Sequence, residues 1–197
     1  MQKYQIKKIF ISIILIFIGV VLDRGVQYTY DRYTFKEHVK HKNIQQEIQN
    51  IDERLNKFYL PLQNALSTSN VLWDDYKKDY GNRTIIEDMK KGIFNTDTLK
   101  WQRYMLSVFQ PIHIEMKKII DGNKHLLLDN SDLKIELDIL VKHISQYQVI
   151  FSQWKSNDYT ENFSLIPFPS KIHDKIKSDI DTLIQQKKQL AEKLNDH

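Results

Sequence analysis

The sequence has no cysteine, and only five glycines and four prolines among its 197 residues. Without cysteine there are no disulfides, no thiol catalysis and no zinc or iron–sulfur site with thiolate ligands. The scarcity of helix breakers leaves long runs rich in Lys, Glu, Gln and Leu, whose side chains lose little rotamer freedom in a helix. These features predict an all-α fold.

Charge of one sign is not in large excess either. The 29 Lys and Arg residues against 25 Asp and Glu give a formal net charge of +4. This balance is too diffuse to indicate nucleic-acid binding, and it suits a protein that lies beside anionic lipid. Hydrophobic residues make up 41% of the chain, which is enough to bury a core. We therefore expect one folded body beside a short anchoring or targeting segment.

Motifs that carry catalysis are missing. The sequence contains no H-E-x-x-H or Glu-x-x-His metal motif, no G-x-S-x-G elbow and no glycine-rich phosphate loop. The dipeptide His173-Asp174 is not accompanied in register by the further histidine and aspartate of HD-type phosphohydrolases. Adjacent Asp74 and Asp75 point about 100° apart on a helix, which favours a solvated face. We interpret His143, at the edge of an apolar stripe, as a structural hydrogen-bonding histidine. The sequence predicts no enzyme, no cofactor, no metal site and no small-molecule substrate.

One long hydrophobic run is present near the amino terminus. Residues 9–22 are apolar apart from Ser12 and Gly19, with charged residues on both sides. A membrane-spanning helix takes about 17–25 residues, and flanking apolar and aromatic residues lengthen this run. A secretory signal peptide has a core of similar length, but no small-residue cleavage site follows here. We therefore predict a retained single-pass transmembrane helix, domain 1–26, whose span includes Ile9, Ile13, Ile16, Phe17, Val20 and Leu22.

The charges beside this run predict its orientation. Three lysines precede it, whereas two arginines and three lysines follow it closely. The more basic flank tends to stay in the cytoplasm. The adjacent pair Lys7-Lys8 opposes this preference, but the balance favours a body on the cytoplasmic side.

A heptad-like stripe of apolar residues runs through the predicted juxtamembrane helix, domain 27–60. Its members alternate at intervals of four and three: Ile44, Ile48, Ile51, Leu55 and Phe58. Such a seam favours either a coiled coil that joins two copies of the chain or a first helix that packs within its own bundle. The following Pro61 removes a helical hydrogen bond and is expected to kink or restart the helix.

Domain 61–197 is predicted to be a bundle of four to five helices, with stripes at helical spacing marking its core. The first stripe comprises Leu62, Leu66, Ser69, Trp73 and Tyr76; the second, in a helix bent near Pro111, comprises Trp101, Met105, Val108, Ile112 and Ile119. The third comprises Leu133, Leu137, Leu140, Ile144, Tyr147, Phe151 and Trp154. A short helix over residues 84–91 and a last helix complete the bundle; the apolar stripe of the last helix comprises Ile172, Ile176, Ile180, Leu183, Leu190 and Leu194. We interpret the tryptophans as core residues, with a ligand pocket as the alternative.

A loop stiffened by prolines separates the last two predicted helices. Its sequence, NDYTENFSLIPFPS, contains Phe163, Pro167, Phe168 and Pro169. Apolar residues in such a loop either cover the open end of a bundle or form a docking surface. Both interpretations remain open from the sequence.

Four segments carry a resemblance to known proteins: KFYLPLQNALSTSNVLW, WQRYMLSVFQPIHIEMKKIIDGNKHLL, HISQYQVIFSQW and a later FP. Together they resemble small bacterial proteins with one amino-terminal membrane helix, a charged helix and a cytoplasmic helical body. Because the shared positions are aromatic residues and prolines, the resemblance implies shared packing and carries no activity, cofactor or catalytic residue. It implies a single-pass protein of the bacterial inner membrane.

Two classes of function fit these features. The first is a non-catalytic helical interaction or sensing module, anchored in the bilayer and acting through a protein partner or a homo-oligomer. The alternative is a membrane-acting effector, such as a toxin or phage-defence component, that works by self-assembly. The predicted partners are therefore the lipid bilayer and a protein, with no nucleic acid.

Overall fold

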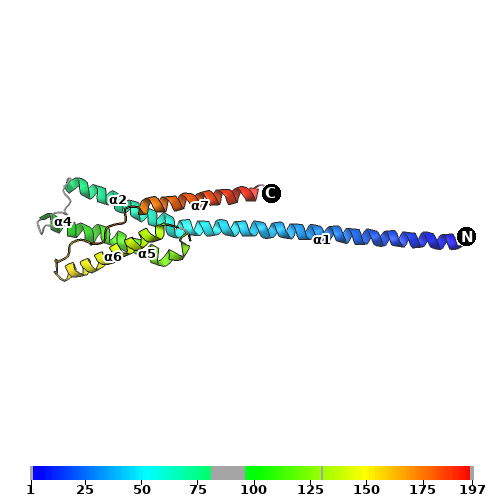
Figure 1. Ribbon diagram of the computed structural model, residues 1–197, viewed down its shortest axis with the longest axis horizontal. Helices are drawn as coiled ribbons and strands as arrows, with labels where there is room; N and C mark the ends of the chain where they lie inside the picture. The colour runs from blue at the N-terminus through cyan, green and yellow to red at the C-terminus, as the bar shows by residue number, and fades with distance from the viewer. Residues whose placement is uncertain (1, 81–95, 130, 196–197) are drawn as a thin grey trace. The chain divides into compact units, whose positions relative to one another are not determined.

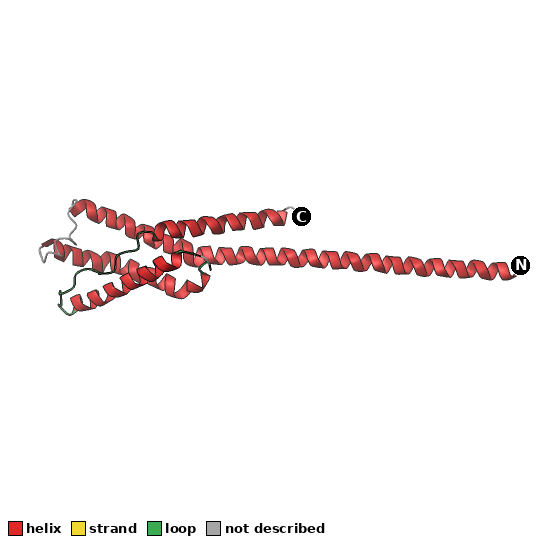
Figure 2. Ribbon diagram, viewed as in Figure 1, coloured by secondary structure: helices red, strands yellow, loops and turns green. Residues whose placement is uncertain are grey.

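The computed structural model describes residues 2–80, 96–129 and 131–195, and within them only the backbone of residues 2–22, 29, 31, 79, 80, 96 and 97. The described residues contain helices and no strand (Figure 2), which confirms the all-α prediction. In chain order the elements are α1 (Gln2–Arg54), η1 (Leu55–Tyr59), α2 (Leu60–Tyr80), α4 (Thr96–Tyr104), η2 (Met105–Phe109), α5 (Gln110–Asn123), η3 (Lys124–Leu126), α6 (Leu133–Lys155) and α7 (Ile172–Asn195) (Figure 1). The short helix predicted over residues 84–91 lies outside the described residues.

The chain divides into two compact units. One comprises Met1–Ile48 with Leu190–His197, and the other comprises Gln49–Gln189. The predicted domain boundaries at residues 26 and 60 both fall within one uninterrupted helical stretch, because α1, η1 and α2 follow each other directly from residue 2 to residue 80. The second unit contains the hydrophobic core that positions the candidate site.

The predicted membrane span lies in α1 and is described by its backbone alone. Ile9, Ile13, Ile16, Phe17, Val20 and Leu22 are therefore placed in a helix, and their side chains lie outside the described part. Among the residues that the structure does describe, no helix is both long and apolar enough to cross a membrane. The transmembrane helix stays a prediction.

Most of the predicted heptad seam is buried within the chain. Ile51 and Leu55 are 8% and 7% exposed, and Phe58 is fully buried in the second unit. Ile44 is also buried, whereas Ile48 is half-buried. The side chains from Ile51 onward thus pack as in a first helix within its own bundle, and self-association through the seam stays a prediction.

Each of the two prolines inside a helix follows a π-helical turn. The Leu60 N–H donates to the Leu55 carbonyl five residues earlier, and the Gln110 N–H donates to the Met105 carbonyl in the same way. Proline has no N–H to donate, and its ring crowds the carbonyl four residues before it. A π-turn adds one residue to the helix at this point, which accommodates the missing bond. The predicted kink or restart at Pro61 and the bend at Pro111 therefore take the form of π-turns.

The second π-turn changes which face of the helix is buried, so the predicted stripe is wrong after Met105. Val108, Ile112 and Ile119 are only half-buried. Their immediate neighbours are buried instead, at 4% exposure or less: Phe109, His113 and Ile120, together with Met116. One extra residue in a turn advances every later side chain by one position, because a regular helix turns about 100° per residue. In α6 all seven predicted positions are buried. In α7, Ile172, Ile176, Ile180 and Leu183 are buried, whereas Leu190 and Leu194 are half-buried, and in α2 the predicted Trp73 is half-buried.

A buried tyrosine ties three elements of the second unit together. The Tyr59 hydroxyl donates to Asp179 Oδ2 of α7 at 3.1 Å and accepts the Leu128 N–H at 3.0 Å. The Ser131 hydroxyl donates to the same carboxylate at 2.5 Å and accepts the Leu133 N–H at 3.0 Å. The Ser131 hydroxyl therefore satisfies the backbone N–H of the first residue of α6. Burial raises the pKa of Tyr59, which stays protonated as a donor.

Replacing Tyr59 by phenylalanine is expected to lower the free energy of unfolding by about 1–3 kcal/mol. The substitution leaves the Leu128 N–H without its acceptor and removes one donor from the Asp179 carboxylate, and unmet buried polar groups cost this much. Tyr159→Phe is the matched control, since the Tyr159 hydroxyl is exposed and bonds only Asn157 at 3.3 Å. Equal stability of the two variants in urea denaturation would contradict the role of this network.

Candidate functional site

A cavity of about 540 Å³ opens between α2, α4, η2, α5 and α6 of the second unit. One side is closed by the wall loop, which we define as residues 156–171 between α6 and α7. The lining comprises Ser69, Asn70, Trp73, Trp101, Met105, Phe109, His113, His143, Tyr147 and residues 163–168. This volume lies within the range of about 300–1,000 Å³ that small-molecule sites occupy.

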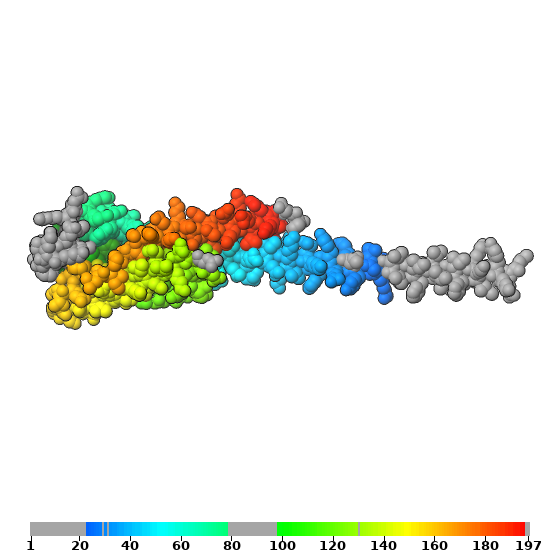
Figure 3. All heavy atoms as spheres, in the orientation of Figure 1, coloured from blue at the N-terminus to red at the C-terminus, as the bar shows by residue number. Residues whose placement is uncertain are grey.

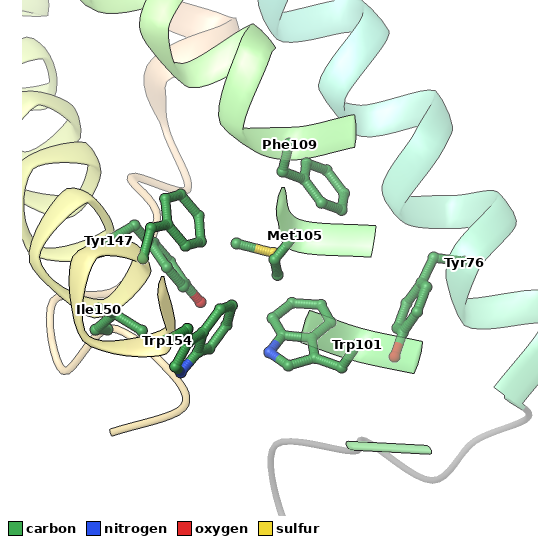
Figure 4. Packing of buried hydrophobic residues seen from close by; sticks show 8 residues of the cluster. Tyr76, Trp101, Met105, Phe109, Tyr147, Ile150 and Trp154 are labelled. Atoms are coloured by element: carbon green, nitrogen blue, oxygen red, sulfur yellow. The ribbon is translucent and has the colours of Figure 1, made fainter. Parts of the chain in front are cut away.

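Aromatic rings make up most of the cavity wall. The ring of Trp73 lies 6.0 Å from that of Trp101 and 6.4 Å from that of Phe109, in both cases edge to face. Figure 4 shows Trp101 and Met105 between Tyr76 of α2 on one side and α6 on the other, where Tyr147 and Trp154 project inward. Edge-to-face pairs at these distances favour a fixed arrangement of the rings.

The wall loop is fastened to the helices by hydrogen bonds to its backbone. The Trp154 indole N–H donates to the Glu161 carbonyl at 2.7 Å, and the Trp101 indole N–H donates to the Asn162 carbonyl at 3.1 Å. These two bonds satisfy the polar ends of two otherwise buried tryptophans. Figure 3 shows the outer surface of this loop, coloured from yellow to orange, along the second unit. These hydrogen bonds therefore hold the loop in place as one wall of the cavity.

His143 holds the part of the loop that faces the cavity. Its Nδ1 lies 2.6 Å from the Ile166 carbonyl oxygen. Because a carbonyl can only accept, Nδ1 carries the proton, and this confirms His143 as a structural hydrogen-bonding histidine. Burial lowers the pKa of His143, against a smaller opposing effect of this hydrogen bond. The ring is thus neutral near pH 7, and its Nε2 presents a lone pair as an acceptor.

His113 lies next to His143 in the cavity wall, with 5.7 Å between the ring centroids. The side chain is 4% exposed, and its Nδ1 has no hydrogen-bond partner among the described residues. Burial lowers the pKa of His113 to about 3, with a further contribution from His143. An imidazole in this setting stays uncharged and leaves one polar atom unsatisfied, which costs stability.

The lining carries no charge at neutral pH. It contains no Asp, Glu, Lys or Arg, and burial raises the pKa of Tyr147 to about 12, so that this phenol is also neutral. Beside the lining, Lys77 has its Nζ 5.8 Å from the ring centroid of Trp73 on α2, and this ammonium is paired with Asp74. The cavity therefore favours uncharged molecules, because a buried charge without a partner is costly.

The other candidate groups from the sequence are engaged elsewhere. Asp74 and Asp75 are exposed and pair with Lys77 and Lys78, as expected of a solvated face. At His173, Nε2 lies 2.6 Å from the Asn70 amide nitrogen, which donates to it. No group of three or more His, Asp or Glu residues that could hold a metal ion is found in the described ranges.

Comparisons of this chain with protein-family models, curated proteins and solved structures found no match. The site must therefore be interpreted from its own residues. The lining offers apolar walls and a few neutral polar atoms, which is the composition of a binding site.

The loop residues predicted for docking lie in or beside this cavity. Phe163, Pro167 and Phe168 line it, and Pro169 is buried. Sequence reasoning gave Trp73 and Trp101 a ligand pocket only as an alternative to core packing. It missed Phe109 and His113, because the π-turn before Pro111 rotates these two residues inward. The sequence feature that could have indicated this rotation is Pro111, because a proline without an N–H requires an irregularity in the preceding helical turn.

Proposed function

We propose that this chain is a non-catalytic sensing module, anchored in a bacterial inner membrane by its amino-terminal helix, with a body on the cytoplasmic side. The observation that carries the sensing role is the uncharged aromatic cavity that the helices and the wall loop of the second unit line. The wall supplies binding area and hydrogen-bonding atoms. Its lining contains no Asp, Glu, Lys or Arg side chain, and its two histidines are neutral near pH 7.

The anchor in this proposal is residues 1–26, followed by a juxtamembrane helix over residues 27–60. Its support is the apolar run 9–22 of the sequence together with its lysine and arginine flanks. A helical backbone through residues 2–54 is what such an anchor requires, because all backbone polar groups must be satisfied inside lipid.

A continuous helical path supports the transmission of a signal. The backbone is helical without interruption from residue 2 to residue 80, and the last part of that path, α2, supplies Ser69, Asn70 and Trp73 to the cavity. A displacement of α2 by a bound ligand would be transmitted along a helix more directly than through a loop. The π-turn at Leu55–Tyr59 is an irregular turn where the hydrogen bonding of the helix can change. The output would be a protein partner or a second copy of the chain.

The test of this proposal is the location of the full chain in bacterial cells. We expect it in the membrane pellet after an alkaline carbonate wash, with its original amino terminus. A reporter enzyme active in the cytoplasm should be active when fused after His197, and a periplasmic reporter should be inactive there. A mature chain that begins near residue 26 and stays in the aqueous fraction would overturn the anchor. Growth arrest on expression that Ile18→Lys abolishes would point to the membrane-acting effector instead.

A further inference from the structure

We propose that the cavity binds an uncharged aromatic molecule with one hydrogen-bond donor, of the phenol or indole type, and that His143 Nε2 accepts that hydrogen bond. Such a molecule would be the ligand of the sensing module, so the inference rests on the proposed function.

The size and walls of the cavity indicate a flat apolar ligand. A volume of about 540 Å³, open to solvent on part of its surface, is lined by rings from α2, α4 and η2 and by Tyr147 of α6. Edge-to-face contacts hold Trp73 against both Trp101 and Phe109. A planar aromatic ligand can stack on or pack edgewise against these rings, whereas a sugar or peptide would leave many polar groups unpaired there.

The absence of charge from the wall indicates an uncharged ligand. No lining residue is an Asp, Glu, Lys or Arg, and both imidazoles are neutral near pH 7. An anion such as an aromatic carboxylate would lose its hydration without gaining a cation, so it should be rejected.

The hydrogen-bonding pattern of His143 indicates a donor on the ligand. Its Nδ1–H is committed to the Ile166 carbonyl at 2.6 Å, which leaves Nε2 as an acceptor. The residue is 8% exposed and lines the cavity. It is wedged between neighbouring rings, with centroid distances of 5.0 Å to Tyr147 and 5.5 Å to Phe168. No hydrogen bond to Nε2 is found within the described residues, so a ligand donor would satisfy it.

The experiment uses the full chain in detergent and three probes that share one ring system: 2-naphthol, naphthalene and 2-naphthoate. Binding is measured by isothermal titration calorimetry for the wild type, His143→Asn, His143→Gln and His125→Asn. The asparagine amide can replace the Nδ1–H donor and offers no acceptor at Nε2, while glutamine offers an acceptor at Nε2 and no donor at Nδ1. His125 is exposed and outside the cavity, so it controls for the substitution itself.

For the wild type we expect 2-naphthol to bind roughly tenfold more tightly than naphthalene, and 2-naphthoate to bind at least tenfold more weakly than 2-naphthol. His143→Asn should bind naphthalene as before and lose the preference for 2-naphthol, His143→Gln should keep that preference, and His125→Asn should match the wild type. Partition of the probes into detergent cancels in the comparison between variants.

Three results would overturn the inference: equal affinity of the wild type for 2-naphthol and naphthalene, tightest binding of 2-naphthoate, or an unchanged preference in His143→Asn. If His143→Asn does not fold, the inference is still tested by the order of the wild-type affinities for the three probes and by whether His143→Gln keeps the preference for 2-naphthol. Failure of the proposed function is distinguishable, because a chain found in the aqueous fraction of cells that still prefers 2-naphthol would keep the ligand site and lose the membrane anchor.

Discussion

Replacing Ile120 by alanine is expected to lower the free energy of unfolding by about 2–5 kcal/mol, whereas the same change at its neighbour Ile119 should cost about 1 kcal/mol. Ile120 is 3% exposed in the core, while Ile119 is half-buried. The two residues are chemically identical and adjacent, so helix propensity changes equally in both variants. The difference therefore measures only which of the two faces the core.

Urea denaturation followed by circular dichroism gives both values. The comparison tests the π-turn at Met105–Phe109, because an α-helix without the extra residue would bury Ile119 with Val108 and Ile112 and would expose Ile120. A larger loss for Ile119→Ala than for Ile120→Ala would contradict the π-turn. It would also remove Phe109 and His113 from the cavity wall, since the same turn brings both of them inward.

Acidification from pH 6.5 to pH 5 is expected to destabilise the fold by about 2 kcal/mol through His113 alone. Burial lowers the pKa of His113 to about 3 in the folded chain, while an unfolded histidine titrates near pH 6.5. In this window the unfolded state therefore binds more protons than the folded state. Stability falls as the pH falls, at roughly 1.4 kcal/mol per pH unit for one such group. His143 adds to the loss, because burial lowers its pKa in the same direction.

The variant His113→Phe isolates this effect. It removes the titrating group and the unsatisfied Nδ1 together, so it should flatten the pH dependence between 6.5 and 5 and be as stable as the wild type at pH 7, or more stable by about 1 kcal/mol. The exposed carboxylates with lowered pKa values, such as Asp132 and Asp158, titrate mainly below this window. An unchanged slope in His113→Phe would show that His113 is not buried as a neutral imidazole.

A neutral, unsatisfied histidine in the wall of a binding cavity is consistent with the proposed sensing role. Buried polar atoms without partners reduce stability, and proteins commonly retain such costs where function requires them. His113→Phe should therefore be tested for binding of 2-naphthol beside its stability. If His113→Phe is more stable than the wild type but binds 2-naphthol more weakly, His113 belongs to the ligand site. If its affinity for 2-naphthol is unchanged, His143 is the polar contact of the ligand.

The sequence by itself determined the helical class, because it has few helix breakers and its apolar residues recur at helical spacing. It also determined the buried face of α6, a helix without an internal irregularity. The seven positions of α6 from Leu133 to Trp154 are all buried, since a stripe that repeats every three to four residues can face only one side of a regular helix. The hydrogen-bonding role of His143 followed from its place at the edge of that stripe.

Only the tertiary structure decided how the site is assembled. Pro111 indicates an irregularity in the helix. A kink, a break and a π-turn can each accommodate the hydrogen bond that proline cannot donate, and each of them buries a different face of the residues that follow. The π-turn places Phe109 beside His113 and His113 against His143, and this last pairing joins residues 30 positions apart. The wall loop also depends on a long-range contact, because the indole N–H of Trp101 donates a hydrogen bond to the Asn162 carbonyl 61 residues later. Periodicity describes one helix at a time, whereas a cavity depends on which faces of several helices meet.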